Sequence, residues 1–276
     1  MTIDSHQHFW QYDRQKHSWM SDQMGAIKRD FLPDDLEEVL KANGLDGCVA
    51  VQADQSEEET HFLNNLADAY DFIKGTVGWV DLRASNVSER LDQLSHLKSV
   101  KGFRHVVQDE PDPEFMLQKS FLNGISKLET HGFTYDILIF PNQLPAAIEL
   151  TRRFPNQKFV LDHIAKPLIE KGELGDWLDG IHELAKSENT TCKVSGMVTE
   201  ANWKNWRYED FLPYLETVFE AFGVERIMYG SDWPVCLVSC DYGKMKSILD
   251  RYIEDFSENE RSAIMGGVAA KFYDLA

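Results

Sequence analysis

Met1-Thr2-Ile3-Asp4-Ser5-His6-Gln7-His8-Phe9-Trp10 opens the chain, and two imidazoles lie two positions apart within it. Side chains of a β-strand alternate between its faces, so His6 and His8 should point the same way, about 7 Å apart. Two neutral imidazoles held like this can bind one divalent cation, or one carbonyl oxygen, from a single side. The alternative is a plain surface strand near the terminus, and the rest of the chain decides between them.

Apolar, β-branched runs recur at regular intervals after this stretch, and segments with helical spacing separate them. With the first run included, the predicted strands span residues 3–9, 47–52, 73–82, 100–107, 134–140, 158–165, 191–196 and 226–233. One predicted helix begins at Pro33, a favoured first-turn residue, and the last spans 257–272. Strands alternating with helices in this number predict an α/β fold, a single (β/α)8 barrel.

The domain organisation follows from length and composition. A chain of 276 residues has a common length for one such barrel, and no Pro/Ser/Gly-rich linker divides it. We therefore expect one domain over residues 1–276.

The connections predict where a site would lie. Those from helix to strand are short, whereas those from strand to helix are longer, notably residues 10–31, 108–114 and 197–208. In (β/α)8 barrels the strand-to-helix loops build the active face. Tryptophans near these loops could belong to the core, but on the open face they would wall a pocket and stack on apolar ring faces of a ligand. They are Trp10, Trp19, Trp203, Trp206 and Trp233.

The net charge of the chain indicates which kinds of partner are disfavoured. Asp and Glu number 46 against 28 Lys and Arg, a formal net charge of −18. Such a field repels nucleic-acid phosphates and anionic lipid, which argues against nucleic-acid and membrane partners and mildly favours a neutral substrate.

The compartment is predicted from cysteines and hydropathy. The four cysteines, Cys48, Cys192, Cys236 and Cys240, include no Cys-x-x-Cys pair. No basic region followed by an apolar run begins the chain, and no apolar stretch approaches the roughly 18 residues of a membrane span. We expect a reduced, cytoplasmic protein.

Polar residues at two strand ends complete a candidate site. His163 has the same parity as Phe159 and Leu161, which predicts that all three face the barrel lumen with His163 uppermost. Asp232 lies at the end of the eighth strand, which neighbours the first in a closed barrel. His6, His8, His163 and Asp232 should therefore converge, which suits one divalent metal ion with Asp232 free to act as a base toward water.

Other strand ends supply further candidates. Arg104 could stabilise an oxyanion, although a structural ion pair is the alternative. Five more polar or aromatic residues are placed to contact a ligand rich in hydroxyl groups, together with Trp203. They are Gln52, His105, Asp136, Lys193 and Trp10.

These residues and several longer blocks resemble a known family. Strand-one Asp4-x-His6-x-His8, with His163 and Asp232, is similar to the amidohydrolase superfamily. More narrowly, six blocks along the whole chain resemble the sugar-lactone hydrolase branch of the amidohydrolase-2 family. This branch includes L-fuconolactonase and L-rhamnonolactonase. The six blocks are residues 6–10 (HQHFW), 77–82 (VGWVDL), 101–111 (KGFRHVVQDEP), 161–163 (LDH), 193–196 (KVSG) and 230–234 (GSDWP).

The resemblance implies a (β/α)8 barrel that hydrolyses a cyclic ester. By position, Asp232 would be the general base, His6, His8 and His163 would bind the metal or polarise the carbonyl, and Arg104 with His105 would line the pocket. Binuclear members carry a bridging lysine after strand four and a histidine after strand five. Here those places hold Arg104-His105 and Asp136, so at most one divalent metal ion is expected, with zinc as the first choice. The alternative, which relatives with this reduced set of ligands leave open, is an enzyme that works without a metal.

The predicted reaction is hydrolysis of a neutral sugar lactone to its aldonic acid. One rival is a decarboxylase, or a lactonase of carboxylated aromatic-ring cleavage products; it should need several arginines, and only Arg104, Arg83 and Arg207 are placed for that. Another is a non-catalytic sugar-binding barrel. Which sugar, which ring size and whether the chain forms a homo-oligomer remain open at this point.

Overall fold

The computed structural model describes residues 1–276, and its eight strands form one parallel sheet in sequence order. The strands are β1 (Ile3–Gln7), β2 (Gly47–Val51), β3 (Ile73–Gly78), β4 (Val100–His105), β5 (Thr134–Ile137), β6 (Phe159–Leu161), β7 (Thr190–Val194) and β8 (Ile227–Tyr229). Just beyond β8, the amide of Asp232 donates to the carbonyl of His6 (2.8 Å) and the amide of His8 to that of Trp233 (2.7 Å), which joins the last strand to the first. The predicted (β/α)8 barrel is confirmed.

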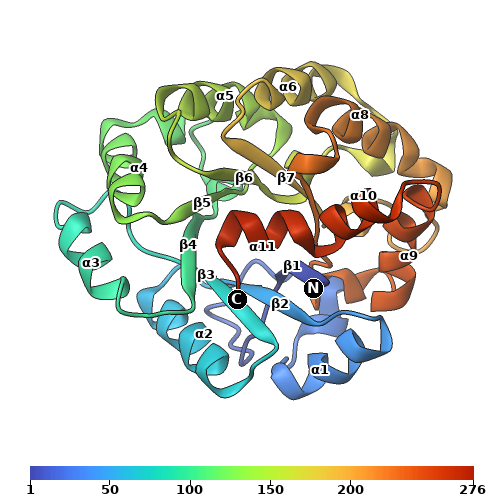
Figure 1. Ribbon diagram of the computed structural model, residues 1–276, viewed down its shortest axis with the longest axis horizontal. Coiled ribbons are helices and arrows are strands. Elements are labelled where there is room, and N and C mark those ends of the chain that lie inside the picture. The colour runs from blue at the N-terminus through green and yellow to red at the C-terminus, as the bar shows by residue number, and fades with distance from the viewer.

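The helices surround the strands on the outside, except that the last one lies across one end of the barrel (Figure 1). They are α1 (Pro33–Ala42), α2 (Glu57–Ala69), α3 (Val87–Leu94), α4 (Lys119–His131), α5 (Leu144–Arg153), α6 (Gly175–Ala185), α7 (Met197–Glu200), α8 (Leu212–Phe222), α9 (Tyr242–Tyr252), α10 (Glu258–Ser262) and α11 (Val268–Tyr273). None of these helices combines the length and the apolar character that crossing a membrane requires.

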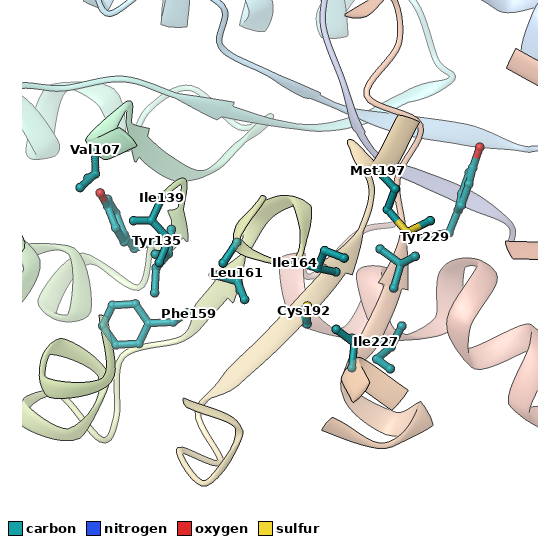
Figure 2. Close-up of a cluster of buried hydrophobic side chains, with 14 of the residues drawn as sticks. Val107, Tyr135, Ile139, Phe159, Leu161, Ile164, Cys192, Met197, Ile227 and Tyr229 are labelled. Atoms are coloured by element: carbon teal, nitrogen blue, oxygen red, sulfur yellow. The ribbon is translucent and has the colours of Figure 1, made fainter. Parts of the chain in front are cut away.

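Two apolar layers fill the fold. Between strands and outer helices lies a large buried cluster, part of which Figure 2 shows around Tyr135, Phe159, Leu161, Cys192 and Ile227. A smaller cluster fills the barrel interior beneath the site. Its members are Ile3, Val49, Val51, Val77, Val160 and Met228 of the strands, with Val268, Ala269, Phe272 and Tyr273 of α11.

This division corrects the predicted parity of β6. Val160 faces the interior, whereas Phe159 and Leu161 pack outward against the helices. The predicted strand 158–165 is also too long, because β6 ends at Leu161. The apolar residues beyond it are buried in the following loop and not paired in the sheet, so composition could not mark the strand's end.

The last predicted helix, 257–272, is interrupted in the structure. α10 and α11 are separated by a π-helical turn, Ala263–Gly267. A Cβ at Gly266 would lie 2.3 Å from the carbonyl oxygen of Met1, so only glycine lets this turn pass so close to the start of β1. The turn directs α11 across the end of the barrel where the strands begin (Figure 1), opposite the candidate site.

Candidate active site

A cavity of about 510 Å³ opens where the strands end and their following loops begin. Of the residues singled out from the sequence, seven line it: His8, Trp19, Gln52, Arg104, His163, Trp203 and Asp232. His6 lies directly beneath, with its ring centroid 5.0 Å from that of His8 and 4.3 Å from that of His163. The structure thus brings the three imidazoles and Asp232 together.

The floor of the cavity is formed by His8, His163 and Asp232. Nδ1 of His8 donates to the carbonyl of Val51 (2.7 Å), so its Nε2 carries the lone pair, 3.4 Å from the Asp232 carboxylate. Nδ1 of His163 is hydrogen-bonded to the Ser195 hydroxyl (2.9 Å), and its Nε2 lies 3.9 Å from the same carboxylate oxygen. Two ring nitrogens and one carboxylate therefore face a common point.

Such a set of donor atoms fits a divalent cation. Two groups have ligand atoms mutually within 4.8 Å: His6, His8 and Asp232, and His6, Asp162 and His163. Each outward-facing imidazole has its other nitrogen fixed by a carbonyl or a hydroxyl, which is how metal-binding histidines are held. A cation bound between these ring nitrogens and carboxylate oxygens would be coordinated by lone pairs that otherwise face one another.

His6 is enclosed by charged groups. Its Nδ1 lies 3.2 Å from both Lys193 Nζ and Asp162 Oδ1, and its Nε2 lies 3.2 Å from Arg104 Nη1. Burial, assisted by the charges of Lys193 and Arg104 and opposed by Asp162, holds the pKa of His6 well below its usual value. The ring is therefore neutral at physiological pH, as a metal ligand or hydrogen-bond acceptor must be.

Asp162 is a central residue that sequence reasoning missed. It is fully buried, receives a 3.1 Å hydrogen bond from Arg104 and lies 3.0 Å from Lys193. Burial works to raise the pKa of Asp162, but Lys193, the contact with His6 and Arg104 together hold it well below its usual value. Asp162 lies two positions after Val160, so a strand with Val160 assigned to the barrel interior would have predicted that Asp162 also points inward.

His163 reaches the cavity through an unusual backbone and not through strand parity. Residues His163 to Lys166 all have left-handed φ angles, between 48° and 60°, and Asp232 has φ 57°. Non-glycine residues adopt this region at a cost of about 1–3 kcal/mol each, and such strain concentrates at functional sites. A Cβ at Gly196 would lie 2.5 Å from His163 Nδ1, so the glycine leaves room for the ring.

Four of the expected substrate contacts lie outside the cavity, and their predicted role is corrected accordingly. Asp136 and Lys193 form a fully buried 2.6 Å ion pair below His6. His105 is bound to Glu110 (2.7 Å) and stacks on Phe115, away from the opening. Trp10 donates to the carbonyl of Arg29 (2.8 Å) within the packed first loop. None of the four is part of the cavity lining.

Trp19, from the first long loop, was expected on the open face and does line the cavity, but Trp206 and Trp233 do not.

The cavity walls also contain residues that the sequence did not single out. Charged residues of several loops line the cavity as well: Lys16, Asp54, Asp109, Lys166 and Glu200. Their position in strand-to-helix loops was the available signal, but many polar loop residues share it.

Arg104, the one arginine in the cavity lining, belongs to both the site and the buried network. Its Nη1 contacts Asp162 and His6, and its Nη2 donates to the carbonyl of Gln52 (2.5 Å). Its Nε is buried without a partner. Arg104 thus forms the ion pair that the sequence offered as one alternative and also lines the cavity, whereas its role toward an oxyanion stays a prediction.

Comparison with known proteins agrees with this geometry. The amidohydrolase family model matches residues 3–275. An L-fucono-1,5-lactonase of Burkholderia multivorans is 39% identical over 286 residues, covering 100% of this chain and 96% of that protein. Two crystal structures of an amidohydrolase from Burkholderia multivorans cover 100% of both chains. One, with bound HEPES, gives a TM-score of 0.96 at 39% identity; the other, with bound zinc, gives 0.95 at 38%.

These matches span the whole barrel and include every strand that contributes to the cavity floor. The chain therefore belongs to the amidohydrolase family.

Proposed function

We propose that this chain is a carboxylic-ester hydrolase that opens a neutral sugar lactone to its aldonic acid. The observation that carries the proposal is the meeting of Asp232 with Nε2 of His8 and of His163 at the floor of one cavity. The full-length similarity to L-fucono-1,5-lactonase indicates the substrate class. The cavity walls carry both lysines and carboxylates, which suits a polar ligand without net charge.

Asp232 acts as the general base. It takes a proton from water as the water oxygen bonds to the lactone carbonyl carbon, and the carbonyl becomes a tetrahedral oxyanion. Arg104 stabilises that negative charge, and His163 can do so in the absence of a metal ion by donating from Nε2–H, with Nδ1 accepting from the Ser195 hydroxyl. The ring C–O bond then breaks, and Asp232 returns the proton to the leaving alkoxide, which becomes a hydroxyl of the open aldonic acid.

The donor set supports one divalent metal ion, with zinc as the first choice because a structure of a similar chain contains it. His6, His8, His163 and Asp232 would hold the ion. When bound, it would polarise the carbonyl and lower the pKa of water. Arg104 places a fixed positive charge 3.2 Å from His6 Nε2, which disfavours a second metal beside it.

A carboxylated aromatic substrate is less compatible with the cavity. Arg83 and Arg207, which such a substrate would use, do not line it. Arg104 does, but its Nη1 is already paired with Asp162.

Location and assembly stay predictions. The four cysteines are unpaired, which supports the expected reduced cytoplasm. A homo-oligomer and the absence of nucleic-acid or membrane partners remain expectations from the sequence.

A pH-indicator assay on a panel of aldono-1,4- and 1,5-lactones, with and without a chelator, tests the proposal. We expect acid release from L-fucono-1,5-lactone or a close stereoisomer. No release from any lactone, by protein that binds zinc and is folded, would refute it. Loss of activity with the chelator and its return with zinc would assign the metal a role in catalysis.

A further inference from the structure

The loops after β6 and β7 are built alike around the cavity. Each places one residue at the floor or directly beneath it and a second on the wall. After β6 these are His163 and, at the end of the left-handed turn, Lys166. After β7, Ser195 holds His163 from below, and Glu200 ends the short helix α7 at the cavity wall. The positions of Lys166 and Glu200 are therefore tied to those of the floor residues.

Lys166 and Glu200 face each other across a gap. Their side chains are only 17% and 20% exposed, and Lys166 Nζ lies 3.8 Å from Glu200 Oε1, beyond hydrogen-bond distance. The two charges form a long ion pair, Lys166 Nζ also lies 5.7 Å from the centroid of the Phe140 ring, and neither side chain has a hydrogen-bond partner at shorter range. Largely buried charges normally have hydrogen-bond partners, so three ammonium donors and the carboxylate lone pairs remain for a ligand in the cavity.

The neighbouring Trp203 gives this part of the wall an apolar surface. Its indole Nε1 donates to the carbonyl of Thr199 (2.9 Å), one residue before Glu200. The polar edge of the ring is thereby occupied, and the ring lines the cavity beside the charged pair. An aromatic ring next to a paired donor and acceptor matches a sugar, which has a C–H face and hydroxyl groups on adjacent carbons.

We infer that Lys166 and Glu200 are specificity-determining residues that bind neighbouring hydroxyls of the sugar lactone, Lys166 as donor and Glu200 as acceptor. The inference rests on the proposed function and extends it. A lactone without hydroxyls would leave both charges unsatisfied, and a site built to hydrogen-bond hydroxyls discriminates strongly against analogues that lack them. The pair is therefore a selective contact and does not take part in the proton transfers.

Lys166→Met and Glu200→Met test this inference, because methionine keeps the length of each side chain and removes the charge. Steady-state kinetics with L-fucono-1,5-lactone should show KM raised about 10–100-fold, the loss typical of one hydrogen bond to a charged group. The kcat should remain within about threefold, since the contact is made equally in ground and transition states. Competitive inhibition by δ-valerolactone, the same ring without hydroxyls, should be as strong as in the wild type or stronger, because each variant removes a charge that this ligand leaves unsatisfied.

Glu170→Met and Lys171→Met are matched controls, because these exposed residues lie in the loop after Lys166 but outside the cavity. They should match the wild type throughout. An unchanged KM in the Lys166 and Glu200 variants, or equal weakening of δ-valerolactone, would overturn the inference while leaving the lactonase assignment intact. A wild-type protein that hydrolyses no sugar lactone would overturn the proposed function and the inference with it.

Discussion

The hydroxyl of Tyr273, in the last helix of the chain, donates a 2.7 Å hydrogen bond to the carboxylate of Asp136 at the centre of the barrel. The same carboxylate oxygen accepts a 2.6 Å bond from Lys193, which in turn contacts His6 and Asp162. All of these side chains are buried. Helix α11 thus closes one end of the barrel and also contacts the charged network that supports the site at the other.

Tyr273→Phe removes this hydroxyl and keeps the ring in the interior cluster. Because the acceptor is a buried carboxylate, we expect a loss of about 1.5–3 kcal/mol in the free energy of unfolding, measured with urea. Tyr214→Phe is the control. Its hydroxyl donates to the neutral carbonyl of Glu173 (3.1 Å), so its loss should cost only about 0.5–1.5 kcal/mol. Equal losses in both variants would contradict the importance of the carboxylate.

Lys193→Met should be more damaging, because it leaves Asp136 and Asp162 buried without their shared cation. Removing one partner of a buried pair costs about 3–5 kcal/mol in unfolding free energy. Asp162 keeps its contact with Arg104, so adding Asp136→Leu to this variant removes the less compensated of the two carboxylates and should restore part of the loss. Urea denaturation of the single and double variants measures both effects, and a double variant less stable than Lys193→Met would contradict the interpretation.

The half-buried Glu59 gives a pH-dependent prediction. Burial raises the pKa of this carboxyl from its usual 4.5 to about 7. The folded state therefore holds the proton more tightly than the unfolded chain. The stability that Glu59 contributes is complete below about pH 4.5 and is lost as the pH rises through about 7.

Glu59→Gln, which cannot ionise, should avoid that loss. Relative to the wild type, its unfolding free energy should rise on the order of 1–2 kcal/mol between pH 4.5 and pH 8, less than the full shift implies because the side chain is partly exposed. Urea denaturation at both pH values measures this difference. Glu58→Gln, at the exposed neighbouring position, is the control. A difference in stability between the wild type and Glu59→Gln that stays constant with pH would contradict the prediction.

Much of the fold followed from local patterns. Alternating apolar runs predict the eight strands, and the spacing of His6 and His8 alone predicts that both rings face one side. Asp232 could be placed because strands one and eight must meet when a barrel closes. These inferences need only chain periodicity and one topological rule.

The rest depends on contacts between distant segments. His163 reaches the floor through a left-handed turn that no propensity indicates, and the parity argument for it was wrong. Lys193 and Asp136 are polar residues in apolar strands and Asp162 directly follows one, and only the packing of neighbouring strands shows that the three side chains meet. Tyr273 joins them because Gly266 permits a break in the last helix, which depends on how closely that turn passes Met1.

Asp232, at the cavity floor, is the proposed general base. The most direct test is the kcat of Asp232→Asn on the lactone that the wild type hydrolyses best, with the binding of the aldonic acid product measured by calorimetry. Asparagine keeps the shape but cannot accept the proton, so kcat should fall by about 10²–10⁴-fold while product affinity stays near that of the wild type. Wild-type turnover in this variant would show that Asp232 is not the general base.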